Sequence, residues 1–136
     1  MDLEISERDR EGVTVLDMHG RLVVGEAVGH LRDTMRRLLN GNKKDIVLNL
    51  AEVDYIDSTG LGTLVICYTS AKKEGGMAKL LNLSKRNIEL IVLTKLTTVF
   101  EVFNDEQAAV NSFFPNREIQ RFDILDFLQQ QEKAGE

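Results

Sequence analysis

The sequence predicts an α/β domain built around a sheet that is at least partly parallel. Short apolar runs typical of strands alternate along the chain with segments whose apolar residues recur every three or four positions, as on the buried side of a helix. Such alternation requires strand–helix–strand crossovers, which join parallel strands. The 136 residues, 43% of them hydrophobic and 29% charged, are enough for one domain with its own core.

The chain is expected to open with a β-hairpin. Residues 3–8 alternate between apolar and polar side chains, residues 8–12 form a polar turn, and residues 13–22 make a second extended run. Gly20 within that run predicts a bulge or a close approach of another backbone. The apolar spacing then predicts a helix over 26–39, with Gly41 as its left-handed cap.

The remaining elements complete a mixed sheet of about five strands with helices packed against it. The expected strands and helices follow in this order: strand 46–50, helix 58–73, strand 77–83, a short helix capped by Ser84, strand 97–100, and a helix capped by Asp105 and stopped by Pro115. We therefore predict one domain over residues 1–115.

Residues 116–136 form a predicted amphipathic extension. Four apolar residues lie three apart, and two more add apolar surface: Ile119, Phe122, Leu125 and Leu128, with Ile124 and Phe127. The simpler interpretation is a terminal helix packed on its own domain, and the alternative is a docking helix or a homodimer contact. Residues 129–136 are expected to fray.

The segment from Asp54 to Gly62, between a buried strand and a helix, is the candidate functional site. Asp57 and Ser58 are both good N-cap residues, and a hydroxyl at the positive end of a helix is well placed to carry a phosphate. Gly60 and Gly62 each cost a helix up to about 1 kcal/mol relative to alanine. We therefore expect them to let another backbone, such as a partner surface, come close.

Catalysis is not expected from these residues. A serine nucleophile needs a histidine base, and His19 and His30 lie on a predicted strand and a predicted helix as ordinary residues. Asp57 is better explained as a cap and Asp54 as a solvated side chain than as a pair of catalytic or metal-binding carboxylates. The Gly-Lys-Ser/Thr of a phosphate-binding loop does not follow the strand. No enzyme activity, metal or cofactor is predicted.

Charge and composition exclude further classes. A net charge of -5 argues against a general nucleic-acid binder, and no apolar stretch approaches the roughly twenty residues that cross a membrane. The acidic, alternating N-terminus does not resemble a signal peptide. The lone Cys67, expected to pack as a small hydrophobic residue, fits a reducing cytoplasm. On the second helix, the outer face bearing Ile66, Thr69 and Lys73 is the expected place for partner contacts.

One block of residues resembles a known family. The run Ile46–Leu50 followed by Val53–Gly62 is similar to the signature of the anti-sigma factor antagonists, which are built on the STAS domain. Three weaker similarities are Gly20-Arg21-Leu22, Gly75-Gly76 and the run 99–103. The resemblance covers roughly residues 3–113 and leaves the C-terminal extension unmatched.

The resemblance implies a switched binding protein. Proteins of this kind bind a serine kinase that otherwise sequesters a sigma factor; the kinase phosphorylates the motif serine, and a PP2C-type phosphatase reverses this. By position, the phosphoacceptor is Ser58, Thr59 is a second candidate, and the partner-binding residues are Asp57, Ser58, Thr59, Gly60 and Gly62. The alternative is a STAS scaffold or ligand-sensing module within a larger signalling assembly.

Overall fold

A computed structural model describes residues 2–118 and 122–135. Its centre is one five-stranded sheet in the order β1-β2-β3-β4-β5, in which β1 is antiparallel to β2 and every other neighbouring pair is parallel. The strands are β1 (Glu4–Arg10), β2 (Val13–Leu22), β3 (Asp45–Ile56), β4 (Met77–Leu81) and β5 (Val102–Phe103). The predicted mixed sheet with an opening hairpin is confirmed.

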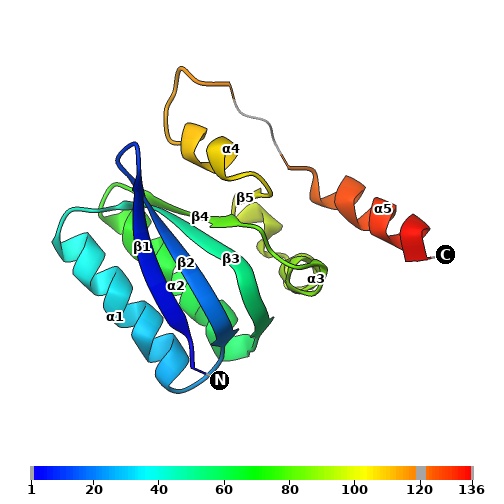
Figure 1. Ribbon diagram of the computed structural model, residues 1–136, viewed down its shortest axis with the longest axis horizontal. Coiled ribbons are helices and arrows are strands. Elements are labelled where there is room, and N and C mark those ends of the chain that lie inside the picture. Colours follow the sequence, from blue (N-terminus) through cyan, green and yellow to red (C-terminus); the bar gives the residue numbers. More distant parts are fainter. Residues whose placement is uncertain (1, 119–121, 136) are drawn as a thin grey trace.

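Helices cover both faces of the sheet (Figure 1). They are α1 (Glu26–Asn40), α2 (Ser58–Lys73), α3 (Lys85–Leu93), α4 (Glu106–Asn111) and α5 (Ile124–Gly135), with a short 3-10 helix η1 (Leu96–Thr98). The main core joins one sheet face to α1, α2 and α3, and a smaller core joins the other face to α4. In β3, Ile46 and Leu48 enter the main core while Val47 enters the smaller one, which explains the unbroken apolar run.

The central strand is longer than predicted. β3 continues past residue 50 because β2 is long enough to pair with it as far as Ile56. Asp54 therefore lies on a strand and not in a loop, where its side chain is exposed. Gly20 fulfils its prediction: the pairing shifts register beside it, its φ is +124°, and a Cβ would lie 2.5 Å from the Asp2 carbonyl oxygen.

Two local predictions are wrong. No strand forms over 97–100 within the described chain; this region holds η1 and a turn, and the last strand is Val102–Phe103. Val102 and Phe103 are buried and pair with β4, whereas Thr97 and Thr98 are exposed. Gly41 is not left-handed, with φ at -88°. The last turn of α1 runs on through it, and the positive φ of 61° falls on Asn42 instead.

The shorter helices start where predicted. The Ser84 hydroxyl accepts a hydrogen bond from the Asn87 N–H at 3.2 Å, and the Asp105 carboxylate accepts one from the Ala108 N–H at 2.8 Å. Helix α4 ends at Asn111, before Pro115, so the proline does not itself stop the helix. Strand β4 likewise ends early, at Leu81, because Asn82 has a φ of 58°.

Helix α5 lies on the α3 side of the molecule (Figure 1). Four of the apolar residues of the extension pack against the main core: Phe122, Ile124, Phe127 and Leu128. Leu125 is 68% exposed, and Ile119 lies outside the described residues. Residues 129–135 belong to α5, and the expected fraying of the C-terminal residues stays a prediction. The domain boundary at 115 stays a prediction.

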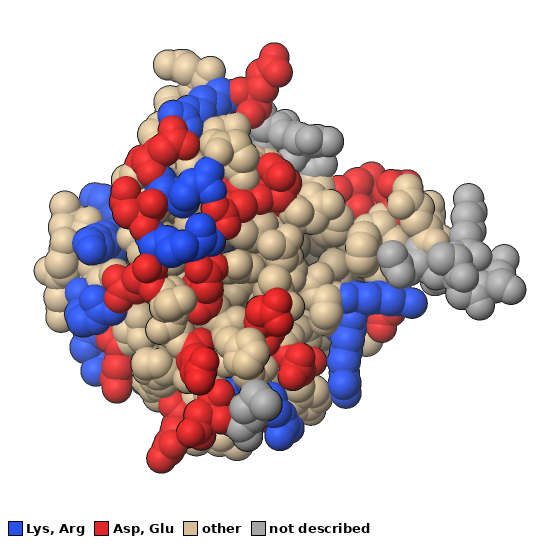
Figure 2. All heavy atoms as spheres, viewed as in Figure 1, with Lys and Arg blue, Asp and Glu red and all other residues tan. Residues whose placement is uncertain are grey.

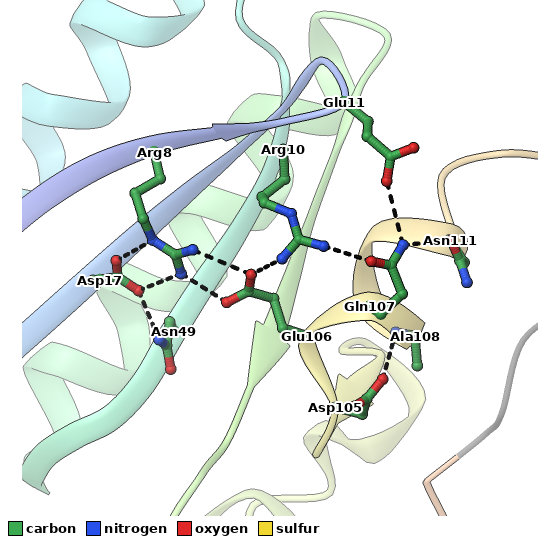
Figure 3. A network of polar contacts seen from close by, with 10 residues as sticks. All are labelled: Arg8, Arg10, Glu11, Asp17, Asn49, Asp105, Glu106, Gln107, Ala108 and Asn111. Atoms are coloured by element: carbon green, nitrogen blue, oxygen red, sulfur yellow. Dashed lines mark hydrogen bonds and ion pairs between the residues drawn. The ribbon is translucent and has the colours of Figure 1, made fainter.

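A polar network on the sheet face opposite α1 and α2 ties α4 to the opening hairpin (Figure 3). The Arg8 guanidinium donates to Asp17 at 2.6 Å and to Glu106 at 2.7 Å, and Arg10 donates to Glu106 and Gln107. Positive and negative side chains accordingly alternate over this part of the surface (Figure 2). These charged groups are paired within the molecule, which makes the network structural.

Candidate functional site

Asp57 caps α2 and also binds the loop between β2 and α1. One carboxylate oxygen, Oδ1, accepts the Gly60 N–H at 2.7 Å, and the other, Oδ2, accepts the Val24 N–H at 2.9 Å. Val24 belongs to the connection between β2 and α1, so Asp57 holds that connection against the start of α2. The bonds from Val24 and Gly60 lower the pKa of the Asp57 carboxyl, and the positive charge of Arg21 adds to them. Asp57 is therefore ionised at neutral pH.

Ser58 is the first residue of α2 and takes no part in capping it. Its side chain is exposed and makes no hydrogen bond to any residue that the structure describes. Thr59 is exposed as well. Both hydroxyls are accessible to a partner, and both stand in the first turn, close to the positive pole of the helix. The Asp57 cap leaves the Ser58 hydroxyl available for modification.

The two glycines of the first turn have different surroundings. Gly60 is buried, and a Cβ there would collide with the Leu22 carbonyl oxygen and lie 2.9 Å from the Leu22 carbonyl carbon. The backbone that approaches Gly60 is thus the protein's own β2, and not that of a partner as we expected. Gly62 is exposed, and a Cβ there would have no neighbouring atom within 4 Å. Gly62 presents bare backbone to solvent.

The exposed side of α2 continues from this first turn. Ser58, Gly62, Ile66, Thr69 and Lys73 are all exposed, and Ile66 keeps 44% of its surface accessible. Their spacing of three and four residues places them on one stripe of the helix. The opposite side of α2 carries the predicted core stripe, where Leu61, Leu64 and Ala71 are buried.

The structure shows no catalytic arrangement around Ser58 within the residues described. His19 is on β2 and His30 is exposed on α1, and neither side chain makes a hydrogen bond to Ser58. No group of three or more His, Cys, Asp or Glu side chains suited to a metal occurs in the described chain. Cys67 is buried as expected, and burial raises the pKa of its thiol to about 12.

Sequence reasoning missed one group of side chains beside the site. The guanidinium groups of Arg21 on β2 and Arg86 on α3 both pack on the ring of Tyr55 on β3. Pairing of β2 with β3 brings Arg21 opposite Tyr55. The signal was present in the Gly20-Arg21-Leu22 run, but it required the register of the two parallel strands to be known.

Comparison with known proteins identifies the family of this fold. A model of the STAS domain matches residues 4–109, and the chain belongs to the STAS domain family. In the described chain, no helix has the length and apolar character of a membrane-crossing segment.

Within the family, the chain is similar to anti-sigma factor antagonists. An anti-sigma-B factor antagonist of Listeria monocytogenes is 32% identical over 110 residues, which cover 78% of this chain and 91% of that protein. The anti-sigma-B factor antagonist of Bacillus subtilis is 39% identical over 66 residues, covering 48% of this chain and 61% of that protein. The protein is thus placed among the STAS-domain anti-sigma factor antagonists.

Solved structures share the fold at lower identity. A Thermotoga maritima protein superposes with a TM-score of 0.75 at 22% identity, over 80% of this chain and 93% of that one. An anti-sigma factor antagonist from Mycobacterium paratuberculosis gives a TM-score of 0.71 at 20% identity, over 82% and 94%. The Bacillus cell fate determinant SpoIIAA in its phosphorylated form superposes with a TM-score of 0.63 at 18% identity, over 80% of this chain and 98% of that one. These likenesses confirm the five-stranded α/β architecture.

Proposed function

We propose that this protein binds an anti-sigma factor that is a serine kinase, so releasing a sigma factor, and that phosphorylation of Ser58 switches binding off. The observation that carries the proposal is the separation of roles at the start of α2: Asp57 caps the helix, while Ser58 stands exposed and free of hydrogen bonds to described residues. The anti-sigma-B factor antagonists among the relatives support a partner of this class.

The proposed binding surface consists of Asp57, Ser58, Thr59, Gly60 and Gly62. Ser58, Thr59 and Gly62 contribute exposed surface, and Gly60 allows the helix to start against β2. The exposed stripe of α2 from Gly62 to Lys73 extends this surface. A protein that controls a sigma factor works where transcription takes place, so the proposed role includes a cytoplasmic location. It also includes a PP2C-type phosphatase that removes the phosphate.

Phosphate on Ser58 is expected to act at the interface and not on the fold. It brings roughly -1.5 to -2 charges, which the positive pole of α2 stabilises by about 0.3–1 kcal/mol at an exposed site. The ionised Asp57 opposes that gain by repulsion, which solvent screens. The two contributions are comparable and opposite. In a partner interface that excludes water, an unmatched phosphate costs up to several kcal/mol.

The proposed mechanism is binding without catalysis. No base is positioned to remove a proton from Ser58 among the described residues, and a serine hydroxyl without one is a poor nucleophile. The proposal includes no cofactor, no metal and no nucleic acid as direct partner.

A scaffold role is the second candidate, and exposed apolar side chains on α3 and α5 favour it. Leu93 is 80% exposed and Leu125 68% exposed, on the two helices that pack near each other. A permanent homodimer through residues 116–128 would support a scaffold or ligand-sensing module. Sedimentation over a range of protein concentrations separates a permanent dimer from a monomer.

Phosphate mapping tests the proposed switch. The protein is incubated with ATP and the purified anti-sigma kinase from its own cell, and phosphate is located by mass spectrometry in the unaltered protein, Ser58→Ala and Thr59→Ala. We expect phosphate on Ser58 and its loss only in Ser58→Ala. Thermal melting and calorimetric titration with the kinase then compare unmodified and phosphorylated protein. Similar melting with a large loss of affinity supports the switch; a rearranged fold or unchanged affinity refutes it.

A further inference from the structure

The ring of Tyr55 holds two arginine side chains in place. The Cζ atom of Arg86 lies 4.9 Å from the ring centroid, and the Cζ atom of Arg21 lies 5.4 Å from it. The three residues come from three elements, namely the ends of β2 and β3 and the first turn of α3. A guanidinium held against an aromatic ring loses less freedom on binding a ligand than one on a free side chain. We call Arg21, Tyr55 and Arg86 the arginine platform.

Neither guanidinium group of the platform contacts a carboxylate among the described residues. Neither Arg21 nor Arg86 forms an ion pair or a hydrogen bond with any residue that the structure describes, and both side chains are exposed. Arg8, Arg10 and Arg37, by contrast, each contact a carboxylate. The hydrogen-bond donors of the platform are therefore open to an external acceptor.

The position of Arg86 is unfavourable for helix stability. The first turn of α3 contains Lys85 and Arg86 and no acidic residue, although the positive pole of a helix favours acids there. The Lys85 ammonium lies 3.9 Å from the Glu89 carboxylate, one turn further along the helix. Two cations at this pole raise the local positive potential, which is useful for attracting an anion and of no benefit to the helix itself.

The platform adjoins the Ser58 loop. Arg21 pairs with Tyr55 across β2 and β3, and the next residue of β2, Leu22, accepts the Asp57 N–H at 3.2 Å through its carbonyl. Arg21 is also close enough to Asp57 to help lower the pKa of that carboxyl. A partner that covers the Ser58 loop and extends over the end of the sheet meets the platform directly.

We propose that the arginine platform binds a carboxylate on the surface of the partner that meets Ser58, which deepens the proposed function and rests on it. An arginine fork matches the two oxygens of a carboxylate, and the two forks of the platform suit one or two acidic side chains. The contact between the arginines and the partner's carboxylate also explains why phosphorylation of Ser58 would weaken binding. A phosphate on Ser58 repels the partner's carboxylate and competes with it for the same cations.

A peptide titration tests the platform without the kinase. Hexaglutamate is added to the ¹⁵N-labelled full chain, and the Nε–H signals of the arginines are followed by NMR at low and high salt. We expect saturable shifts at Arg21 and Arg86 that weaken with salt, and smaller shifts at the carboxylate-paired Arg8 and Arg10. Equal shifts at all four arginines, or none at the platform, would contradict the proposal.

Binding to the kinase tests whether the platform is used. Arg21→Gln and Arg86→Gln are each expected to weaken binding about tenfold or more, as for a lost charge-assisted hydrogen bond. Lys43→Gln removes one positive charge from an exposed residue at the opposite end of the sheet, and serves as the matched control. Unchanged melting shows that each variant is folded.

The outcomes separate the two proposals. If the unaltered protein binds the kinase and the arginine variants bind equally well, or no worse than Lys43→Gln, the platform proposal fails while the proposed function stands. If the unaltered protein does not bind a kinase, the proposed function fails, and with it the platform's partner. The platform proposal is supported if Arg21→Gln and Arg86→Gln alone lose affinity for the kinase, and if this loss is smaller at high salt.

Discussion

Replacing Asp57 by asparagine tests how the site is held together. The Asp57 carboxylate uses one oxygen for Gly60 and the other for Val24, at 2.7 and 2.9 Å. Asparagine is normally as good an N-cap as aspartate, but it has one acceptor oxygen and its other group is an NH₂ donor. In Asp57→Asn, therefore, either Val24 or Gly60 must lose its acceptor and face a donor.

The expected cost follows from these two bonds. A hydrogen bond to a charged group contributes about 1.5–3 kcal/mol, and exposure to solvent at this site reduces the figure to about 1 kcal/mol for the bond that asparagine cannot make. Asp57→Ala loses both bonds and should cost about 2 kcal/mol. For a chain of this size these values correspond to falls in Tm of about 4 and 8 °C.

The difference in stability between the unaltered protein and Asp57→Asn should depend on pH. The folded protein lowers the pKa of Asp57 below its unfolded value of about 3.9, so its stabilisation is complete above that value and is lost as pH falls through the lowered folded pKa. Urea denaturation should show the full difference in free energy of unfolding between the unaltered protein and Asp57→Asn at pH 7. This difference should become smaller below about pH 4. Equal stability at pH 7, or a gap that persists undiminished in acid, would refute the reasoning.

Two further predictions concern the glycines and the C-terminal extension. Gly60→Ala should destabilise the fold by several kcal/mol because the methyl group meets the Leu22 carbonyl, whereas Gly62→Ala should stabilise it by about 0.5–1 kcal/mol, as for alanine in an open helix position; equal effects in denaturation would contradict this. Removing residues 116–136 should leave a cooperatively unfolding but less stable domain, since the extension covers part of an otherwise complete core; loss of cooperative unfolding would show that the extension is integral.

The sequence was sufficient where one local pattern determines the structure. The caps at Ser84 and Asp105 and the core stripe of α2 each depend on residues close together in the chain. The last strand was misplaced because Thr97–Phe100 has good strand propensity, while the pairing with β4 selected Val102 and Phe103.

The same limit applied to the site. The motif identified Asp57 and Ser58, and the interpretation of Asp57 as a cap is confirmed. Gly60 was expected to admit a partner, and its neighbour is Leu22, a residue 38 positions earlier that only the parallel pairing of β2 and β3 brings there. The arginine platform depends on the same long-range register. Residues that act through partners distant in sequence were the ones missed.

The comparison of α2 with α3 shows why the separation of cap and hydroxyl matters for a switch. In α3 the Ser84 hydroxyl itself accepts the Asn87 N–H, so a modification of that oxygen would alter the cap and the helix with it. In α2 the carboxylate of Asp57 performs this task, and Ser58 begins the helix without supporting it. If Ser58 is phosphorylated as proposed, we expect the hydrogen bonds from Gly60 and Val24 to Asp57 to remain in place. The phosphate would then change the surface that a partner meets while the domain stays folded in both states, which a reversible binding switch requires.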